Sequence, residues 1–333
     1  MTIGKGDVVL ATGATGFTGI HLVKALCDTG ADVRAIVRAG SKTQVLDGLP
    51  ITYFRGDVFD EATCREAAQG VTYIFHVAAA FREAKIDDNV YHRVHVESTQ
   101  HLARAVADNA GFKRFVHIST MGVHGHIDNP PADETYRFAP GDAYQRTKVE
   151  AETWIRDHAR ETGLPLTVVR PCAIYGPGDM RLLKVFRMAR MPVVPVLGFG
   201  SKNLYHLVHV EDLVNFMIYA AQQETTLGEV YLCGADEPIR LVDMIGRIAD
   251  RLGRRARILR LPVTPFFWAG DLCEAVCKPL GIEPPIYRRR VAFYTKDRAF
   301  DTSKMRGTGF TNRYSNETGI DALTDWYKEA GWL

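Results

Sequence analysis

The chain has 333 residues, which is enough for about two domains. Its 46% hydrophobic and 24% charged residues are typical of a globular protein and exclude a disordered chain or a coiled coil. A formal net charge of +2 gives no reason to expect a nucleic-acid partner or an anionic membrane surface. We see no signal peptide and no run that could cross a membrane, so we expect a cytoplasmic protein.

The six cysteines form no pattern typical of a zinc site. None lies in a CxxC pair, and no arrangement of histidines or carboxylates completes a ligand set. We therefore expect mostly buried free thiols in a reducing compartment, and no metal.

Short apolar runs alternate with helical patterns through the first half of the chain. We expect buried strands at residues 8–11, 33–37, 51–54, 73–77, 115–118 and 166–169, and helices at 20–29, 91–110 and 143–161. The strand segments are rich in Val and Ile and mostly lack alternation, as in parallel strands covered on both faces. The pattern predicts an α/β fold with a doubly wound parallel sheet.

The pattern becomes less regular after residue 174, where proline and glycine are frequent. We place a first domain at residues 1–175. The chain is expected to return to the sheet at 204–210 and 230–233, so segments near 204–235 belong with that domain. Residues 176–333 then form a smaller, discontinuous C-terminal lobe that would bind a substrate.

Three glycines spaced three apart connect the first strand to the first helix. Gly13 would permit the tight turn, Gly16 would let a pyrophosphate approach the backbone, and Gly19 would let the helix pack against the strand. The helix N-terminus adds free N–H groups for phosphates. A plain tight turn is the alternative. We expect this turn, including Thr15 and Phe17, to bind a dinucleotide.

The end of the second strand distinguishes the two nicotinamide dinucleotides. Sites for NAD usually place a carboxylate there, which accepts a hydrogen bond from the ribose 2′-hydroxyl. This chain has Arg38, Ser41 and Lys42 instead, which could bind a 2′-phosphate. We therefore favour NADP(H), with NAD(H) as the alternative, in which case these are solvated loop residues.

Two further segments are expected to contact the cofactor. Asp57, which precedes Val58 after the third strand, could accept a hydrogen bond from the adenine amino group. Ala78 and Ala79 end the fourth strand and are small enough for close passage of a ribose.

Tyr144 and Lys148 lie four residues apart at the start of a predicted helix, so both project from one face. A nearby ammonium would lower the pKa of the tyrosine and help it act as an acid or base near neutral pH. Ser119 and Thr120 follow the fifth strand, at the edge where doubly wound sheets bind ligands. Either hydroxyl could hold a substrate oxygen while Tyr144 transfers the proton. Alone, such a Tyr-Lys pair also occurs by chance on solvent-facing helices.

A set of motifs spans nearly the whole chain: TGATGFTG at 12–19, GDV at 56–58, HVAA at 76–79, ISTMGVHG at 118–125, YQRTK at 144–148, RPCAIYGPGD at 170–179 and LVHVEDL at 207–213. Together they resemble the extended short-chain dehydrogenase/reductase family of NAD-dependent epimerases and dehydratases. The similarity is greatest to its 3β-hydroxysteroid dehydrogenase and dihydroflavonol reductase-like branch. The resemblance implies a Rossmann fold and a homodimer packed through helices 91–110 and 143–161.

The resemblance also implies roles for individual residues. Tyr144 would be the general acid/base, Lys148 its partner and a ligand of the nicotinamide ribose, and Thr120 the hydroxyl that orients the substrate, with Ser119 as the neighbouring candidate. Pro171 and Ile174 would line the nicotinamide.

Two histidines depart from the family pattern. In the segment HVEST, His95 stands where the family often has asparagine, as in NVEGT, so a proton-relay role for that asparagine has no counterpart here. His95 either substitutes for it or only packs. His124 stands where the family commonly has tyrosine, and it either faces the substrate or is a buried histidine with satisfied hydrogen bonds.

The second lobe favours an apolar substrate. Sugar-nucleotide members of the family carry an arginine that meets the diphosphate, whereas Tyr205 occupies that position here. Arg181, Arg187, Arg190 and the arginines at 288–290 could substitute, although such runs more often face solvent. The apolar segment 262–280 could lie near a substrate, pack into the lobe, or contact a partner or a membrane surface.

The sequence therefore predicts an NAD(P)-dependent oxidoreductase. It would transfer a hydride between nicotinamide and a carbonyl or alcohol carbon of a bulky, largely apolar, steroid- or flavonoid-like molecule. The first alternative is a nucleotide-sugar 4-epimerase or dehydratase with tightly bound NAD, and the second is a non-catalytic NADP sensor. We expect a small-molecule substrate, no nucleic acid and no transmembrane segment, with peripheral membrane contact through 262–280 left open.

Overall fold

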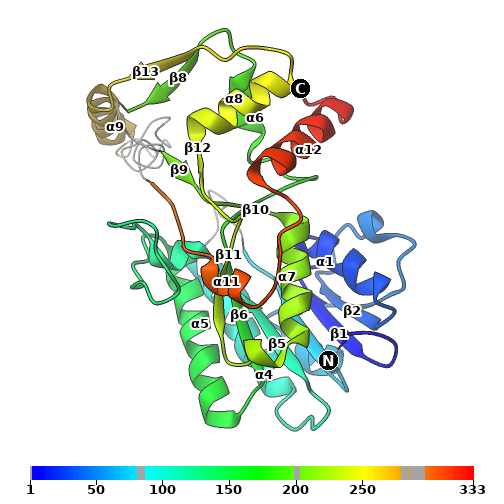
Figure 1. Cartoon of the computed structure of the whole chain (residues 1–333). Helices are drawn as coiled ribbons and strands as arrows, with labels where there is room; N and C mark the ends of the chain where they lie inside the picture. The colour runs from blue at the N-terminus through cyan, green and yellow to red at the C-terminus, as the bar shows by residue number, and fades with distance from the viewer. Residues whose placement is uncertain (1, 81–86, 199–202, 278, 280–283, 285–296) are drawn as a thin grey trace.

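A computed structural model describes residues 2–80, 87–198, 203–277, 279, 284 and 297–333 (Figure 1). Its centre is a seven-stranded sheet in the order β3-β2-β1-β4-β5-β6-β11, in which every neighbouring pair is parallel. The strands are β1 (Val8–Thr12), β2 (Asp32–Val37), β3 (Ile51–Arg55), β4 (Tyr73–His76), β5 (Arg114–Ile118), β6 (Leu166–Pro171) and β11 (Val230–Cys233). All six strands predicted in the first half are confirmed, as is the doubly wound α/β fold.

Helices cover both faces of this sheet (Figure 1). One face carries α1 (Phe17–Asp28) and α7 (Val210–Gln222), and the other carries α2 (Glu61–Ala67), α4 (Ser98–Ala105) and α5 (Ala143–Thr162). Because side chains alternate along a strand, neighbouring residues of one strand enter different cores.

Strand β1 illustrates this alternation. Val9 packs in the core beneath α1 and α7, while Leu10 packs in the core beneath α2, α4 and α5. Both side chains are fully buried. Burial on both faces explains why the strand sequences are continuously apolar.

The helix predicted over 91–110 differs from the structure. It begins earlier, as α3 (Asp88–His92), continues as a π-helical turn (Arg93–Glu97) and ends with α4 at Ala105. Two hydroxyls bond to carbonyl oxygens four residues back, Ser98 Oγ to Val94 at 2.5 Å and Thr99 Oγ1 to His95 at 2.6 Å. Such side-chain bonds compete with the regular backbone hydrogen bonds of an α-helix. Ser98 and Thr99 therefore favour the π-helical turn that precedes them.

The second half of the chain adds three small two-stranded sheets. They pair β7 (Ala173–Tyr175) with β10 (Leu207–His209), β9 (Leu204–Tyr205) with β12 (Ile239–Arg240), and β8 (Val194–Leu197) with β13 (Ile258–Leu261). Of the two segments expected to return to the main sheet, 230–233 does so as β11. The other, 204–210, instead forms strands of the small sheets, because its run is broken at His206, whose ring bonds to Ala235 O at 2.7 Å.

A separate hydrophobic cluster lies among α6 (Leu183–Ala189), α8 (Leu241–Arg251) and α12 (Asn316–Glu329). The remaining helices are α9 (Thr264–Cys277), α11 (Ser303–Gly307) and the short 3₁₀ turns η1 (Gln44–Leu46), η3 (Met121–His124) and η4 (Glu224–Thr226). Among the described residues, no helix combines the length and apolar character needed to span a membrane.

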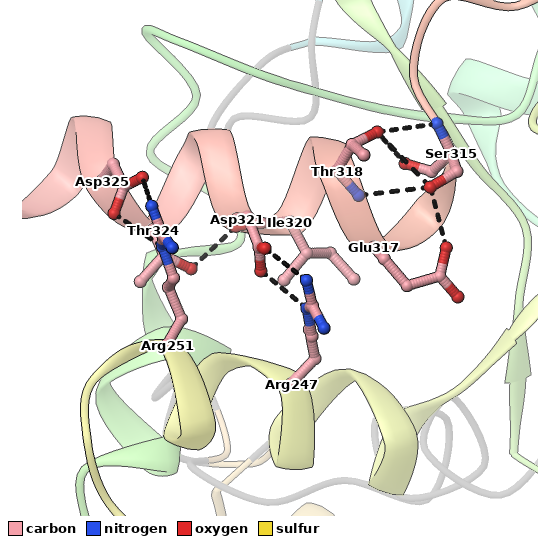
Figure 2. A network of polar contacts seen from close by, with 9 residues as sticks. All are labelled: Arg247, Arg251, Ser315, Glu317, Thr318, Ile320, Asp321, Thr324 and Asp325. Carbon is pink, nitrogen blue, oxygen red and sulfur yellow. Dashed lines mark hydrogen bonds and ion pairs between the residues drawn. The ribbon is translucent and has the colours of Figure 1, made fainter.

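Two matched ion pairs join α8 to α12 (Figure 2). Arg247 forks onto Asp321, and Arg251 forks in the same way onto Asp325 one turn along. Both pairs are partly exposed, so each contributes little to stability. They join the polar sides of the two helices, while Ile320 and Leu323 of α12 enter the hydrophobic cluster that the helices share.

Candidate active site

The glycine turn lies where the sheet order reverses, between β1 and β4. Gly13 has a φ of +71°, and a Cβ there would lie 2.9 Å from Ala78 Cα. A Cβ on Gly19 would lie 2.0 Å from Gly13 O. Gly16, the N-cap residue of α1, has no side chain to cover the first N–H groups of the helix. The turn is therefore narrow at its base and exposes donors at its rim, which fits a pyrophosphate.

Thr12, to which the sequence analysis assigned no role, joins the end of β1 to the chain after β4. Its Oγ1 accepts hydrogen bonds from the N–H groups of Val77 and Ala78, each at 3.1 Å, and lies 2.8 Å from His76 Nδ1. A polar residue at the end of an otherwise apolar buried strand is the signal that could have revealed it. Ala78 is buried beside Gly13, and Ala79 is exposed.

The residues expected around the adenosine lie at the carboxyl ends of β2 and β3. Arg38 and Lys42 are exposed on a turn in which Ser41 N–H donates to Arg38 O at 2.9 Å. Asp57 is exposed, and Val58 is half-buried against the core beneath α2. Two cations and no carboxylate on the β2 turn fit a phosphate at this end of the site.

Lys148 connects α5 to the end of β5. It is buried, and its Nζ donates to Ile118 O at 2.8 Å. Burial lowers the pKa of Lys148 to about 8, and the nearby carboxylate of Glu152 opposes that shift. This bond brings the ammonium next to Ser119 and Thr120, which directly follow Ile118.

Of the three polar side chains expected at the reacting centre, Ser119 and Thr120 follow β5 directly, and Tyr144 lies on α5, the helix that carries Lys148. Thr120 Oγ1 accepts a hydrogen bond from Gly122 N–H at 3.1 Å, so its hydroxyl proton remains available for a ligand oxygen. Ser119 is buried, and its Oγ has no hydrogen-bond partner among the described residues. Tyr144 is partly exposed, one turn before Lys148 on α5. The arrangement can hold an oxygen atom and exchange a proton with it.

His95 lies beside Tyr144, with ring centroids 5.2 Å apart in an edge-on contact. Its Nδ1 is 2.9 Å from Thr147 Oγ1, and its Nε2 accepts from Ala80 N–H at 3.1 Å. Thr147, the buried polar residue between Tyr144 and Lys148, had no assigned role. It could have been noticed as a hydroxyl on the helix face that carries the Tyr-Lys pair.

His124 is fully buried away from this edge. Its Nδ1 is 3.3 Å from Arg137 O, and Arg170 donates to its Nε2 at 3.2 Å. Arg170 also forks onto the buried carboxylate of Glu152. Of the two interpretations, the structure supports a buried histidine with satisfied hydrogen bonds.

The residues expected on the nicotinamide and substrate side belong to the end of β6 and to the segments after it. Pro171 is the last residue of β6 and is buried. Ile174 lies in β7 and is half-buried. Arg181 is held by Asp179, at 2.7 Å from its Nε, and by Ile174 O. Tyr205 lies on β9. Arg187 and Arg190 are exposed on and beside α6, and the arginines at 288–290 lie outside the described residues.

Comparison with known proteins identifies relatives over most of the chain. Residues 9–234 match the NAD dependent epimerase/dehydratase family. The 4-hydroxy-2-methyl-3-oxo-4-farnesyl-3,4-dihydroquinoline-1-oxide ketoreductase of Stigmatella aurantiaca is 30% identical, covering 94% of each chain. A 3 beta-hydroxysteroid dehydrogenase/Delta 5→4-isomerase of Mycobacterium tuberculosis is 30% identical, covering 78% of this chain and 73% of its own.

A solved structure has the same fold. The UDP-glucose 4-epimerase of Thermotoga maritima, with UDP-glucose, gives a TM-score of 0.75 over 97% of this chain and 99% of its own. The two sequences are 21% identical, so this likeness concerns the fold alone.

Proposed function

Since the chain belongs to the NAD-dependent epimerase/dehydratase family of enzymes, we propose that it is an oxidoreductase of bulky, largely apolar carbonyl compounds and alcohols, steroid- or flavonoid-like in size and polarity. The relatives of the hydroxysteroid dehydrogenase-like branch confirm the resemblance noted in the sequence. We also propose NADP(H) as the preferred cofactor, since Arg38 and Lys42 stand where a carboxylate would select NAD(H).

The proposal rests mainly on the edge where Lys148 reaches Ile118 O. In the direction of reduction, a nicotinamide held beside Pro171 and Ile174 would supply the hydride that the carbonyl carbon receives. Thr120 donates a hydrogen bond to the carbonyl oxygen, and Tyr144 gives that oxygen a proton, which completes the alcohol. The positive charge of Lys148 stabilises the phenolate left on Tyr144. In the direction of oxidation, Tyr144 takes the proton.

The apolar character of the substrate is supported by three observations. Tyr205 replaces the arginine expected for a sugar diphosphate, and Arg181 is already held by Asp179. The two relatives described above are named for a farnesylated quinoline oxide and for hydroxysteroids, which are both bulky and apolar.

The variant Tyr144→Phe tests the assignment of the proton donor. We expect kcat to fall by about 10²–10⁴-fold, while the Kd for NADPH changes by less than about threefold. Tyr53→Phe, on the edge strand β3, is the matched control and should keep wild-type kcat. Full activity in Tyr144→Phe would reject the assignment.

The nucleotide-sugar epimerase is the second candidate, because the fold is shared with such an enzyme. It predicts that NAD is retained through purification, that NADPH is not consumed, and that UDP-sugars raise the melting temperature. Our proposal predicts that NAD is not retained, that NADPH is consumed, and that UDP-sugars leave the melting temperature unchanged. A thermal-shift panel of sterols, flavonoids and UDP-sugars with NADP present separates the two, and stabilisation by UDP-sugars alone would overturn our choice.

We further propose a cytoplasmic homodimer that packs through the helical segments 91–110 and 143–161, which include α4 and α5. All six cysteines are free, which supports a reducing compartment. Light scattering at micromolar concentration should give twice the mass of the chain, and a monomer would reject the dimer. Cell fractionation tests the location.

Peripheral membrane contact is a separate proposal, supported by α9. Trp268, Leu272 and Val276 follow one another at helical spacing and are 70%, 68% and 54% exposed. The end of the apolar segment, at residue 280, lies outside the described residues. Co-sedimentation with liposomes tests this contact, and failure to pellet would reject it.

A further inference from the structure

We propose that His95 is a positioning residue of the hydride-transfer site: a neutral imidazole that ties the catalytic helix α5 to the chain leaving β4, where the cofactor is expected. This inference rests on the function proposed above. It concerns a residue that stands where the family pattern has asparagine, and it explains what that histidine does here.

The two contacts of His95 fix its protonation state. Thr147 Oγ1 lies 3.0 Å from Ala143 O and 3.1 Å from Tyr144 O, and both are acceptors, so the hydroxyl proton of Thr147 is used there. The proton in the 2.9 Å contact with Thr147 must therefore come from His95 Nδ1. At the other end, Ala80 N–H donates to Nε2, which cannot carry a proton. Both contacts require the same neutral tautomer.

Burial keeps the imidazole neutral. His95 is 1% exposed. Desolvation by burial lowers its pKa to about 2, and the positive charge of Lys148 acts in the same direction. A second proton would sit on Nε2 and face the N–H of Ala80, so protonation would also break one of the two bonds.

The tie joins two parts of the proposed site. Thr147 lies between Tyr144 and Lys148 on α5, so a bond to its hydroxyl restrains the turn that carries both side chains. Ala80 follows Ala78 and Ala79, which are expected to be small enough for a cofactor ribose to lie close to them. The ring of His95 therefore restrains the helix that carries the proton donor relative to the chain after β4, and its edge-on contact limits the rotation of the Tyr144 ring.

A second departure from the family pattern strengthens the same connection. Ser98 stands where NVEGT has glycine, and its Oγ lies 3.0 Å from His76 Nε2. His76 in turn contacts Thr12 at the glycine turn. The π-helical turn over Arg93–Glu97 includes His95, and π turns are frequent at functional sites. Both unusual residues of HVEST thus bond to the end of β4 or the chain after it.

The first measurement does not depend on activity. Protein labelled with ¹⁵N-histidine should show one ring, assigned to His95 by its loss in His95→Asn, with the proton on Nδ1 and an unprotonated Nε2 from pH 5 to pH 8. A proton on Nε2, or an imidazolium in that range, would overturn the tie.

The second measurement separates positioning from structure. For His95→Ala we expect kcat to fall by roughly 10–100-fold, as for a small misplacement of reacting groups, with the NADPH Kd within about threefold. His95→Asn keeps an N–H at the δ position and should recover about tenfold of that loss. The matched control is His92→Ala, three residues away, where an exposed histidine contacts Glu150 of the same helix α5. It should keep wild-type kcat.

The outcomes distinguish this inference from the proposed function. A wild-type kcat in His95→Ala, or a loss no larger than in His92→Ala, would overturn the positioning role of His95 and leave the proposed oxidoreductase function intact. A parallel loss in His95→Ala and His95→Asn, explained by lower melting temperatures, would also overturn it. A wild-type protein that turns over no carbonyl compound would reject the proposed function. In that case, the tautomer of His95 and the Kd for NADPH would still test whether His95 links α5 to the chain after β4.

Discussion

Lys148 donates from its buried Nζ to the carbonyl oxygen of Ile118 at 2.8 Å, which places a cation at the end of β5, next to the middle strand of the large sheet. The contact lies at the edge of the sheet where we propose that the reaction takes place. It also implies a cost, because a buried ammonium has lost most of its hydration. The site is therefore expected to lower the stability of the protein without bound cofactor.

We expect Lys148→Met to be more stable than the wild type at pH 7 in the absence of nucleotide. The pKa of Lys148 falls from 10.5 to about 8 on folding, which corresponds to a penalty on the order of 3 kcal/mol. The folded pKa lies below the unfolded one, so the penalty is complete below pH 8 and disappears as the pH rises to about 10.5. Urea unfolding at pH 7 and pH 10 should show the difference between the two proteins shrinking. A constant difference would contradict this account.

The buried pair of Glu152 and Arg170 should be among the most sensitive sites in the molecule. Glu152→Ala leaves the guanidinium buried without its carboxylate, which costs about 3–5 kcal/mol of unfolding free energy. Glu150→Ala, two residues away on the exposed side of α5, removes only a contact with His92 and should cost less than about 1 kcal/mol. Equal losses in the two variants would show that burial of the pair has no special importance.

Arg38→Asp should change the choice between the two cofactors. Losing charged hydrogen bonds to a 2′-phosphate is worth about 1.5–3 kcal/mol, so the Kd for NADPH should rise roughly 10–100-fold while that for NADH stays equal or falls. Arg160→Asp, near the end of α5, provides a matched change of charge at an exposed position. If both Kd values changed in parallel, Arg38 would not be the selecting residue.

Gly19→Ala tests the packing of the cofactor turn. The new Cβ would meet Gly13 O at 2.0 Å and two further backbone atoms below 3 Å, so the turn must open. We expect a loss of at least about 1–3 kcal/mol of stability and a Kd for NADPH at least about tenfold weaker. Gly246→Ala on α8 is the control, because its Cβ meets nothing within 4 Å, and it should gain about 0.5–1 kcal/mol. An unchanged Kd for NADPH in Gly19→Ala would count against the glycine turn as the binding site of the pyrophosphate.

Much of the fold could be predicted because the strands are buried on both faces and therefore leave unmistakable apolar runs. Thr120 could be placed at the carboxyl edge of the sheet from the strand before it, and Tyr144 and Lys148 on one helix from their spacing, whereas their shared catalytic role stays a prediction. Thr12 and Thr147 could have been noticed as polar residues at buried positions, but their hydrogen-bond partners could not be predicted, because those depend on which segments the topology brings together. The π-helical turn also escaped, since its residues have ordinary helical periodicity.

A π turn contains more residues than the α turn that it replaces, and this makes the length of the segment Arg93–Glu97 part of the site. Each residue of a regular helix advances the chain by about 100° around the axis. A homologue one residue shorter here would keep Ser98 and Thr99 in place but rotate α3, which carries the Tyr91 ring that meets Tyr144 edge-on. Sequence alignments of this region should therefore be read by gap placement as well as by residue identity.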